Sequence, residues 1–305
     1  IIIIFFISIT IIQVAVLLFS IPFDIVYYYK LKPFNLIKSS LGFWLIRTVS
    51  SQIIQIFVIS GIVTLIYITI KKTKYYIVYL PLLFFIISFS ISYLYPRFFT
   101  PLFYDKKPLA NKELNHKINK FLKNINLQVN KIEVLNKSKY ANTVNAYMTG
   151  IGNDRRIVLY DTLINNFSHE EVISVLAHEI AHYKEEHVLI GVSLASLSII
   201  LVIFLLNKMA IFSGLSGLKE LLEPRNHITL FILVTILFYF SKPVENSISR
   251  IMERRADTFA LETTKKPTAF ISLKVKMAKK NKSYLLYNPI HSFYFRSHPT
   301  VIERI

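Results

Sequence analysis

The sequence predicts a mainly α-helical, polytopic membrane protein that also carries an α+β domain. Hydrophobic residues make up 53% of the 305 residues, which is more than a soluble domain of this length needs. They gather in long runs without charged residues. The polar remainder lies mostly in two stretches, of which the first contains both helix and strand patterns.

Four hydrophobic runs are long enough to cross a membrane as helices, namely 1–20, 53–70, 75–93 and 188–206. Each has about 18 to 20 residues, which suffices for a hydrocarbon core of about 30 Å. A fifth run, 228–241, spans only about 21 Å and must recruit its flanks or be shielded by protein. A single run can be a buried core helix, but four in one chain favour a multi-pass integral membrane protein.

The order of the runs predicts which polar segments share a side of the membrane. The regions 96–187 and 242–305 return to the same side if the hairpin 188–241 crosses twice. The loop 21–50 faces that side as well, because two crossings separate it from the first region. All three are rich in basic residues, which favours the cytoplasmic side, although the short turn 71–74 with three lysines opposes this. We therefore expect a cytoplasmic site at a bacterial inner membrane or the endoplasmic reticulum.

Charge and cysteine content narrow the classes of function. The formal net charge of +18 is better explained by basic cytoplasmic loops than by nucleic-acid binding, so no nucleic-acid partner is expected. The chain has no cysteine, which excludes disulfides and thiolate metal ligands. A metal site must therefore use His, Asp or Glu.

The first polar region has the pattern of a small mixed domain. Asn111–Asn124 predicts an amphipathic helix, and 131–135, 142–148 and 156–160 predict strands. The turn residues between 150 and 154 predict that the last two strands form a hairpin.

A helix with metal-binding spacing follows these strands. Ser168 is a good N-cap, and Glu171 three residues later completes a capping box. The helix then carries His178-Glu179-Ile180-Ala181-His182, the pattern H-E-x-x-H. Its two histidines lie about 40° apart around the helix, one turn from each other, so both imidazoles can bind one Zn²⁺. Glu179 can take a proton from the attacking water and pass it to the leaving amine. A surface helix with two incidental histidines is the alternative.

The third metal ligand must come from elsewhere in the chain. Metzincins supply a downstream histidine after a glycine, but Glu185 stands at that glycine position. His187 falls on the opposite face if the helix continues, so we interpret it as a non-ligand. The better candidate is Glu253, which shares a helix face with Asp257. Asp257 would accept the spare N–H of a ligand histidine. The open alternatives are pairing of both carboxylates with Arg250 and Arg254 on a solvated face, and Glu245 or Glu262 as the ligand.

Together these residues resemble the CAAX prenyl protease 1 family, the type I CAAX prenyl endopeptidases or a-factor-converting zinc metalloproteases. The resemblance begins with H-E-x-x-H followed, after a membrane hairpin, by E-x-x-x-D from Glu253 to Asp257. It extends over nearly the whole chain through Ile21–Phe23, Lys32–Asn35, Tyr95–Phe103, Pro108–Leu109, Asn145–Gly150, Arg156–Leu163 and Ser297–Arg304.

The resemblance implies a zincin-like α+β metalloprotease domain with one Zn²⁺ per chain, held by His178, His182 and Glu253. Asn145 would bind the substrate backbone or help to stabilise the oxyanion, and His298 would donate a hydrogen bond to the tetrahedral oxyanion. The implied partners are the lipid bilayer and a peptide or prenylated protein substrate, cleaved at its C-terminal CAAX tripeptide. The family has more membrane helices than the runs found here, and the match of loop 22–35 places the others before Ile1. We therefore expect an N-terminally truncated chain.

Three other functions compete with this interpretation. An HtpX-like quality-control protease shares H-E-x-x-H and the later glutamate, but the segments 95–103 and 297–304 fit it less well. A site-2-type intramembrane protease places H-E-x-x-H in a hydrophobic helix, whereas Lys184, Glu185 and Glu186 follow the motif here. A membrane transporter or scaffold with a structural histidine pair is the non-enzymatic alternative.

Overall fold

The computed structural model describes residues 2–150 and 152–305, which form two compact units. Unit 1 consists of residues 1–33, 39–88 and 191–241. Unit 2 consists of residues 34–38, 89–190 and 242–305. Each polar region predicted to share a site therefore belongs mainly to unit 2.

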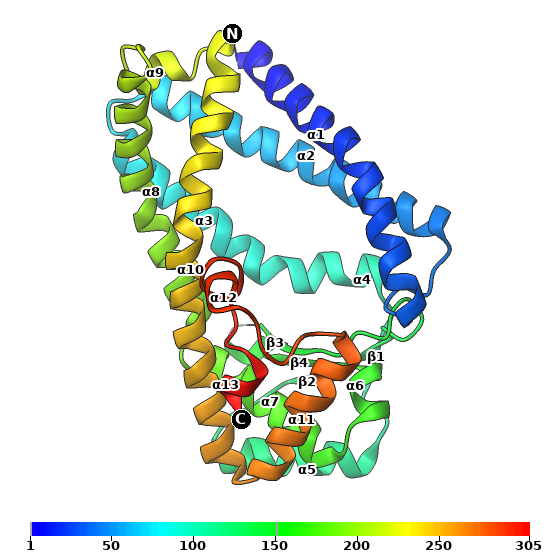
Figure 1. Cartoon of the computed structure of the whole chain (residues 1–305). Coiled ribbons are helices and arrows are strands. Elements are labelled where there is room, and N and C mark those ends of the chain that lie inside the picture. The colour runs from blue at the N-terminus through cyan, green and yellow to red at the C-terminus, as the bar shows by residue number, and fades with distance from the viewer. Residues whose placement is uncertain (1, 151) are drawn as a thin grey trace. The chain divides into compact units, whose positions relative to one another are not determined.

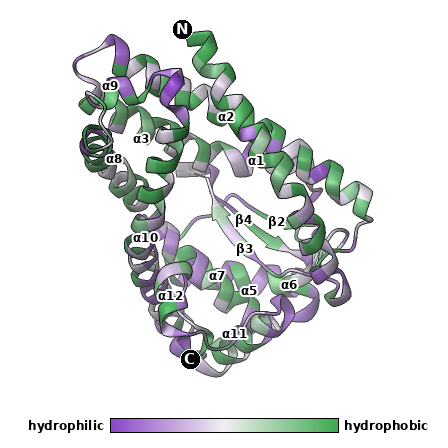
Figure 2. Cartoon of the chain, turned by 45° about the horizontal axis from the view of Figure 1, so that its top comes forward, coloured by the Kyte–Doolittle hydropathy of each residue, from purple (hydrophilic) through white to green (hydrophobic). Residues whose placement is uncertain are grey.

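Unit 1 is built from long apolar helices (Figure 1). Its elements are α1 (Ile2–Leu31), α2 (Leu41–Lys72), most of α3 (Tyr76–Leu94) and of α8 (His187–Phe212), α9 (Leu218–Leu221) and the first part of α10 (His227–Thr264). Among the described residues, five helices are long and apolar enough to cross a membrane. Figure 2 shows mainly hydrophobic ribbons for α1, α2 and α8. Large apolar side chains such as Ile3 and Phe19 are exposed along α1, as expected of a lipid-facing helix.

Several helices extend well beyond the hydrophobic runs that predicted them. Ser40 caps α2 by accepting a hydrogen bond from Phe43 N, so this helix begins before the run 53–70. The short run 228–241 is the first part of α10, which continues to Thr264 without interruption. It thus recruits its C-terminal flank, one of the two outcomes expected for a run of its length.

Polar side chains inside unit 1 pair with one another between α1 and α2. Thr10 Oγ1 donates to Ser60 Oγ at 3.0 Å, and Gln13 Nε2 donates to the same oxygen at 2.8 Å. Phe5 stacks on Tyr67 with ring centroids 4.1 Å apart. These contacts join helices whose surroundings offer no water for unpaired hydroxyl or amide groups.

Unit 2 contains a four-stranded sheet with the strand order β1-β2-β4-β3. The strands are β1 (Lys106–Pro108), β2 (Lys131–Leu135), β3 (Ala146–Thr149) and β4 (Arg156–Tyr160). β2 and β4 are parallel, and the other two pairs are antiparallel. The helices of this unit are α4 (Thr100–Phe103), α5 (Lys112–Asn124), α6 (Asp161–Asn166), α7 (His169–Lys184), α11 (Pro267–Asn281), α12 (Pro289–Phe295), α13 (Val301–Arg304) and the second part of α10.

The core of unit 2 lies between the sheet and the helices α5, α7 and α11. The predicted amphipathic helix is confirmed as α5, with Asn111 as its N-cap and Leu114, Ile118, Phe121 and Leu122 buried. Val172, Leu176 and Ile180 of α7 have no exposed surface. Because this face of α7 is buried in the core, the helix has a fixed rotation about its axis.

The predicted hairpin is confirmed, although its first strand is shorter than expected. β3 begins at Ala146 rather than at residue 142. Just before it, Val144 N donates to the side chain of Asn281, and Thr143 O accepts from Thr162, so these backbone groups are not paired in the sheet. In the turn, Gly150 has φ of 96°, and a Cβ there would lie 1.9 Å from the carbonyl oxygen of Asp154. Ile151 in the same turn is not among the described residues.

Candidate metal centre and active site

The predicted capping box at the start of α7 is present and also joins a second helix. Ser168 N donates to Glu171 Oε2 at 2.7 Å, and Glu171 N donates to Ser168 Oγ at 3.3 Å. The other carboxylate oxygen of Glu171 accepts from Ser272 at 2.6 Å and pairs with Lys276 at 2.7 Å, both on α11. Burial opposes ionisation of Glu171, but these partners outweigh it and lower the pKa of its carboxyl group. α7 is therefore held at its N-terminus against α11.

Three predicted metal ligands converge from α7 and α10. His178 Nε2 and His182 Nε2 lie 3.3 Å apart, and each lies 3.3 Å from one oxygen of Glu253. Ligand atoms of all three residues lie within 4.8 Å of one another. His178 and Glu253 are buried, whereas His182 is partly exposed. The sequence places Glu253 far from the histidines, and the fold of unit 2 brings it to them.

The donor set fits a tetrahedral metal ion. Ligand atoms bound to zinc at about 2.1 Å lie about 3.4 Å from one another, close to the separations found here. Two imidazoles and one carboxylate are a known set for catalytic zinc, and they leave one position open.

Asp257 lies behind this group on the side away from the Nε2 atoms. Its Oδ1 is 2.9 Å from His178 Nδ1. This buried nitrogen has no other polar partner among the described residues. Lys274 Nζ lies 2.9 Å from the same Oδ1, and Arg304 contacts Asp257 Oδ2 at 2.7 Å and Glu253 Oε2 at 3.1 Å. The two carboxylates thus pair with these partners and not with Arg250 and Arg254, the partners of the solvated-face alternative.

The charges of this cluster shift the pKa values of its members. Burial favours neutral His178, but the Asp257 and Glu253 carboxylates outweigh it and raise the pKa of the imidazole. Burial lowers the pKa of Lys274 to about 8 despite the neighbouring Asp257. Burial opposes ionisation of Glu253 and Asp257, but contacts with His178 and their other basic neighbours outweigh it and lower the pKa of both carboxyl groups, which leaves Glu253 anionic as a metal ligand requires.

His187 contacts His182, contrary to the expectation that it lies on the opposite helix face. α7 ends at Lys184, and Glu186 adopts φ of 54°, which reverses the chain before α8 begins. His187 Nδ1 thereby lies 2.8 Å from His182 Nδ1, and its Nε2 lies 3.2 Å from Glu185 Oε2. His187 is not part of the candidate ligand group, but it contacts the ring nitrogen of His182 that faces away from Glu253.

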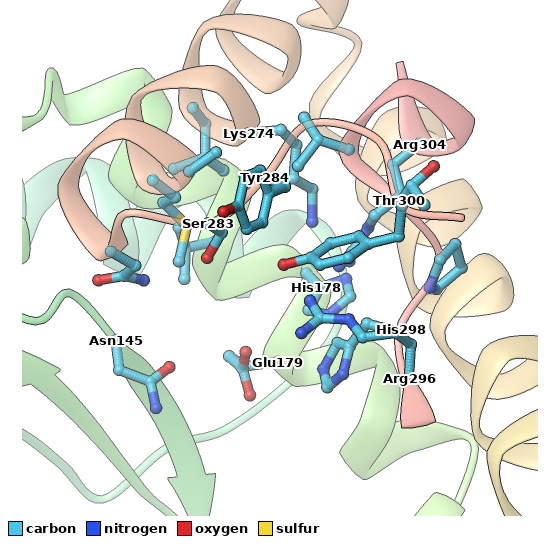
Figure 3. Close-up of a pocket in the computed structure, with 18 residues that line it drawn as sticks. Asn145, His178, Glu179, Lys274, Ser283, Tyr284, Arg296, His298, Thr300 and Arg304 are labelled. Atoms are coloured by element: carbon cyan, nitrogen blue, oxygen red, sulfur yellow. The ribbon is translucent and has the colours of Figure 1, made fainter. Parts of the chain in front are cut away.

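His178 of the metal group lines a cavity of about 350 Å³ within unit 2. His178, Glu179, Asn145 and His298 all line it, so the structure brings the predicted catalytic residues together (Figure 3). Asn145 directly precedes the edge strand β3. His298 Nε2 lies 3.2 Å from Glu253 Oε1, and its Nδ1 lies 2.9 Å from Ser297 Oγ.

Burial also sets the protonation of the two groups nearest to the reaction. It raises the pKa of Glu179, and His178 opposes this rise. A raised pKa makes this carboxylate a stronger base once it is ionised. Partial desolvation lowers the pKa of His298, whose side chain is 53% exposed, and the neighbouring Glu253 carboxylate opposes this shift.

Three further residues of the cavity were not predicted from the sequence. Lys274 and Arg304 support Asp257, and Arg296 extends into the cavity beside His298 (Figure 3). Lys274 is 9% exposed, which is unusual for lysine, and the sequence around it gives no sign of this burial. Arg304 belongs to the segment 297–304 that resembles the CAAX protease family, and this was the available signal.

Comparisons with known proteins identify a family of peptidases. The model of "Peptidase family M48" matches residues 108–305. An uncharacterized metalloprotease of Bacillus subtilis, YhfN, is 30% identical, over 94% of this chain and 69% of its own length. CAAX prenyl protease 1 of Saccharomyces cerevisiae is 30% identical over 74% of this chain and 54% of its own length, and the Arabidopsis thaliana homolog is 29% identical over 80% and 58%. The chain thus spans less than two thirds of these two CAAX proteases.

The fold has a close counterpart among solved structures. The crystal structure of S. mikatae Ste24p superimposes with a TM-score of 0.82 at 24% identity, covering 96% of this chain and 73% of that one. This match confirms the predicted fold class, a mainly α polytopic membrane protein with an α+β domain.

Proposed function

The chain belongs to peptidase family M48, and we propose that it is a zinc-dependent endopeptidase that cleaves near the C-terminus of prenylated CAAX proteins. Family membership and the five apolar helices confirm two predictions, a metallopeptidase and a multi-pass membrane protein. The observation that carries the proposal is the convergence of His178, His182 and Glu253, together with the cavity that His178 and Glu179 line. The CAAX specificity is supported by the names of several relatives.

The residues of the candidate site have separate roles in the proposed hydrolysis. His178, His182 and Glu253 hold the zinc ion, which would act as a Lewis acid on the scissile carbonyl and lower the pKa of the attacking water. Glu179 accepts a proton from this water and later donates it to the leaving amine. His298 donates a hydrogen bond to the developing oxyanion, and Asn145 binds the substrate backbone at the edge of the sheet. Asp257 orients His178 through its Nδ1 atom.

The proposed orientation places this site on the cytoplasmic side of the membrane. The supporting observation is the basic character of loop 21–50 and of both polar regions of the sequence. A bacterial inner membrane or an endoplasmic reticulum membrane satisfies this orientation equally.

The experiment that tests the proposal compares the purified chain with Glu179→Gln. We expect stoichiometric zinc in both proteins and cleavage of a fluorogenic farnesylated CAAX peptide only by the first, with a loss of at least about 10³-fold in the variant. Chelation should abolish cleavage, and added zinc should restore it. Absence of bound metal in the unmodified chain would refute the zinc site. Bound zinc with cleavage only of unprenylated peptides would refute the CAAX specificity and favour a quality-control protease.

A further inference from the structure

Arg296 is a cation in the cavity wall that forms no ion pair with any described residue. Its guanidinium contacts the ring of Tyr287, with 4.2 Å between the guanidinium carbon and the ring centroid. It lies two residues before His298 and lines the same cavity as His178 and Glu179. In Figure 3 the Arg296 side chain extends from the same segment as His298 into the cavity.

The other lysine and arginine of the wall are already neutralised. Lys274 pairs with Asp257, and Arg304 pairs with both Asp257 and Glu253. Glu179 is the one carboxylate among the described lining residues, and it forms no ion pair with Arg296. The positive charge of Arg296 is therefore available to a ligand that enters the cavity.

Arg296 is also held in place before any ligand arrives. Arg250 Nη1 donates to Ser292 O at 3.1 Å and to Arg296 O at 2.7 Å, which fixes the end of α12. Stacking on Tyr287 restricts the plane of the guanidinium. A fixed arginine loses less conformational entropy on binding than a free one, so its contribution to affinity is larger.

We propose that Arg296 binds the C-terminal α-carboxylate of the peptide substrate, and so selects peptides that end shortly after the scissile bond. The proposal rests on the peptidase function proposed above. A planar guanidinium fork matches a carboxylate with two parallel hydrogen bonds. His178 of the candidate metal centre lines the same cavity as Arg296, so a peptide bound there has its chain within reach of Arg296. An acidic side chain of the peptide offers the same carboxylate group. The test therefore has to distinguish the C-terminal α-carboxylate from such a side chain.

The test measures binding to the metal-loaded Glu179→Gln protein, which retains the cavity without cleaving. Two CAAX peptides are compared that differ only in a C-terminal carboxylate or carboxamide. We expect the carboxylate peptide to bind about 10-fold to 100-fold more tightly, the range for charged hydrogen bonds. Adding Arg296→Met should reduce this ratio toward one, and Arg296→Lys should restore part of it. Lys279→Met, an exposed α11 residue outside the cavity, is the charge-matched control and should keep the full ratio.

Each contrary result overturns a defined part of the proposal. Equal binding of both peptides would exclude a carboxylate site, and an unchanged ratio after Arg296→Met would exclude Arg296 as its donor. Full restoration of affinity by a glutamate side chain in the amidated peptide would exclude selection of the chain terminus. Zinc content and melting temperature of the Arg296→Met protein show whether it is folded. Cleavage by the unmodified chain is measured separately, so failure of the peptidase function appears there and not in the binding ratio.

Discussion

Unit 1 buries neutral polar side chains, whereas unit 2 buries charged ones. The buried polar residues described in unit 1 are Ser60, Thr64, Ser196 and His227. Those of unit 2 include Glu171, Glu253, Asp257 and Lys274, each paired with an opposite charge. A hydroxyl pair between membrane helices contributes little free energy and can be lost at little cost. A buried charge becomes strongly destabilising when its partner is removed, so the cluster in unit 2 depends on all of its members.

The largest expected effect comes from breaking the charged cluster of unit 2. Asp257→Asn leaves Lys274 and Arg304 buried with one carboxylate fewer. We expect a loss of about 3–5 kcal/mol in the free energy of unfolding, measured by denaturant titration in detergent micelles. Asp105→Asn, an exposed position of the same unit, is the control and should change stability by less than about 0.5 kcal/mol. Equal effects of the two variants would contradict the comparison.

A smaller effect is expected where a neutral residue supports the metal group. His187→Leu removes the contact with His182 Nδ1 and should weaken metal binding by about 10-fold to 100-fold, measured by competition with a chelator. His187→Asn keeps an acceptor near the position of Nδ1 and should recover most of this loss. If both variants bind metal as tightly as the unmodified chain, His187 has no part in orienting His182.

The pH dependence of metal binding provides a third test. A proton and a metal ion compete for the imidazole of His178, whose pKa is raised. The affinity for metal should not depend on this group above that pKa and should fall below it by about tenfold per pH unit for this group alone. Competition with a chelator of known affinity between pH 8 and 5 measures the fall, whose onset should lie above pH 6.5, the ordinary value for histidine. An onset below this value would contradict the stabilising role of Asp257 and Glu253.

The smallest effect is expected in unit 1. Ser60→Ala removes the acceptor of both Thr10 and Gln13 and should cost about 0.6 kcal/mol, the average for such bonds between membrane helices. The measurement is the same denaturant titration. A loss as large as that of Asp257→Asn would show that neutral and charged polar groups are buried with equal consequence.

Local sequence patterns predicted much of the fold and two of the three candidate metal ligands. The period of apolar residues predicted α5, and the Ser168–Glu171 spacing predicted the capping box, because both depend on neighbours along one helix. The pairing of His178 with His182 follows from the same periodicity. Each of these features lies within one helix, so a single segment of sequence determines it.

Features that depend on distant segments or on backbone reversals could not be predicted in the same way. The environment of Lys274 arises because α11 packs on α7, which no local pattern indicates. The position of His187 depends on Glu186, a residue without glycine's freedom that nevertheless adopts a positive φ. Spacing alone also left open whether Glu253 faces solvent or the histidines, since both arrangements share one helix face.

Glu171 couples the first turn of α7, the helix that carries His178 and His182, to α11. Helices normally open from their ends, and the first turn of α7 would exchange its amide protons by fraying. Here the carboxylate that caps this turn also binds Ser272 and Lys276 of α11. Fraying of α7 must therefore break the attachment of α11, the helix that carries Lys274. The two segments are expected to exchange hydrogen as one cooperative unit, so the metal ligands and their supporting lysine are gained or lost together.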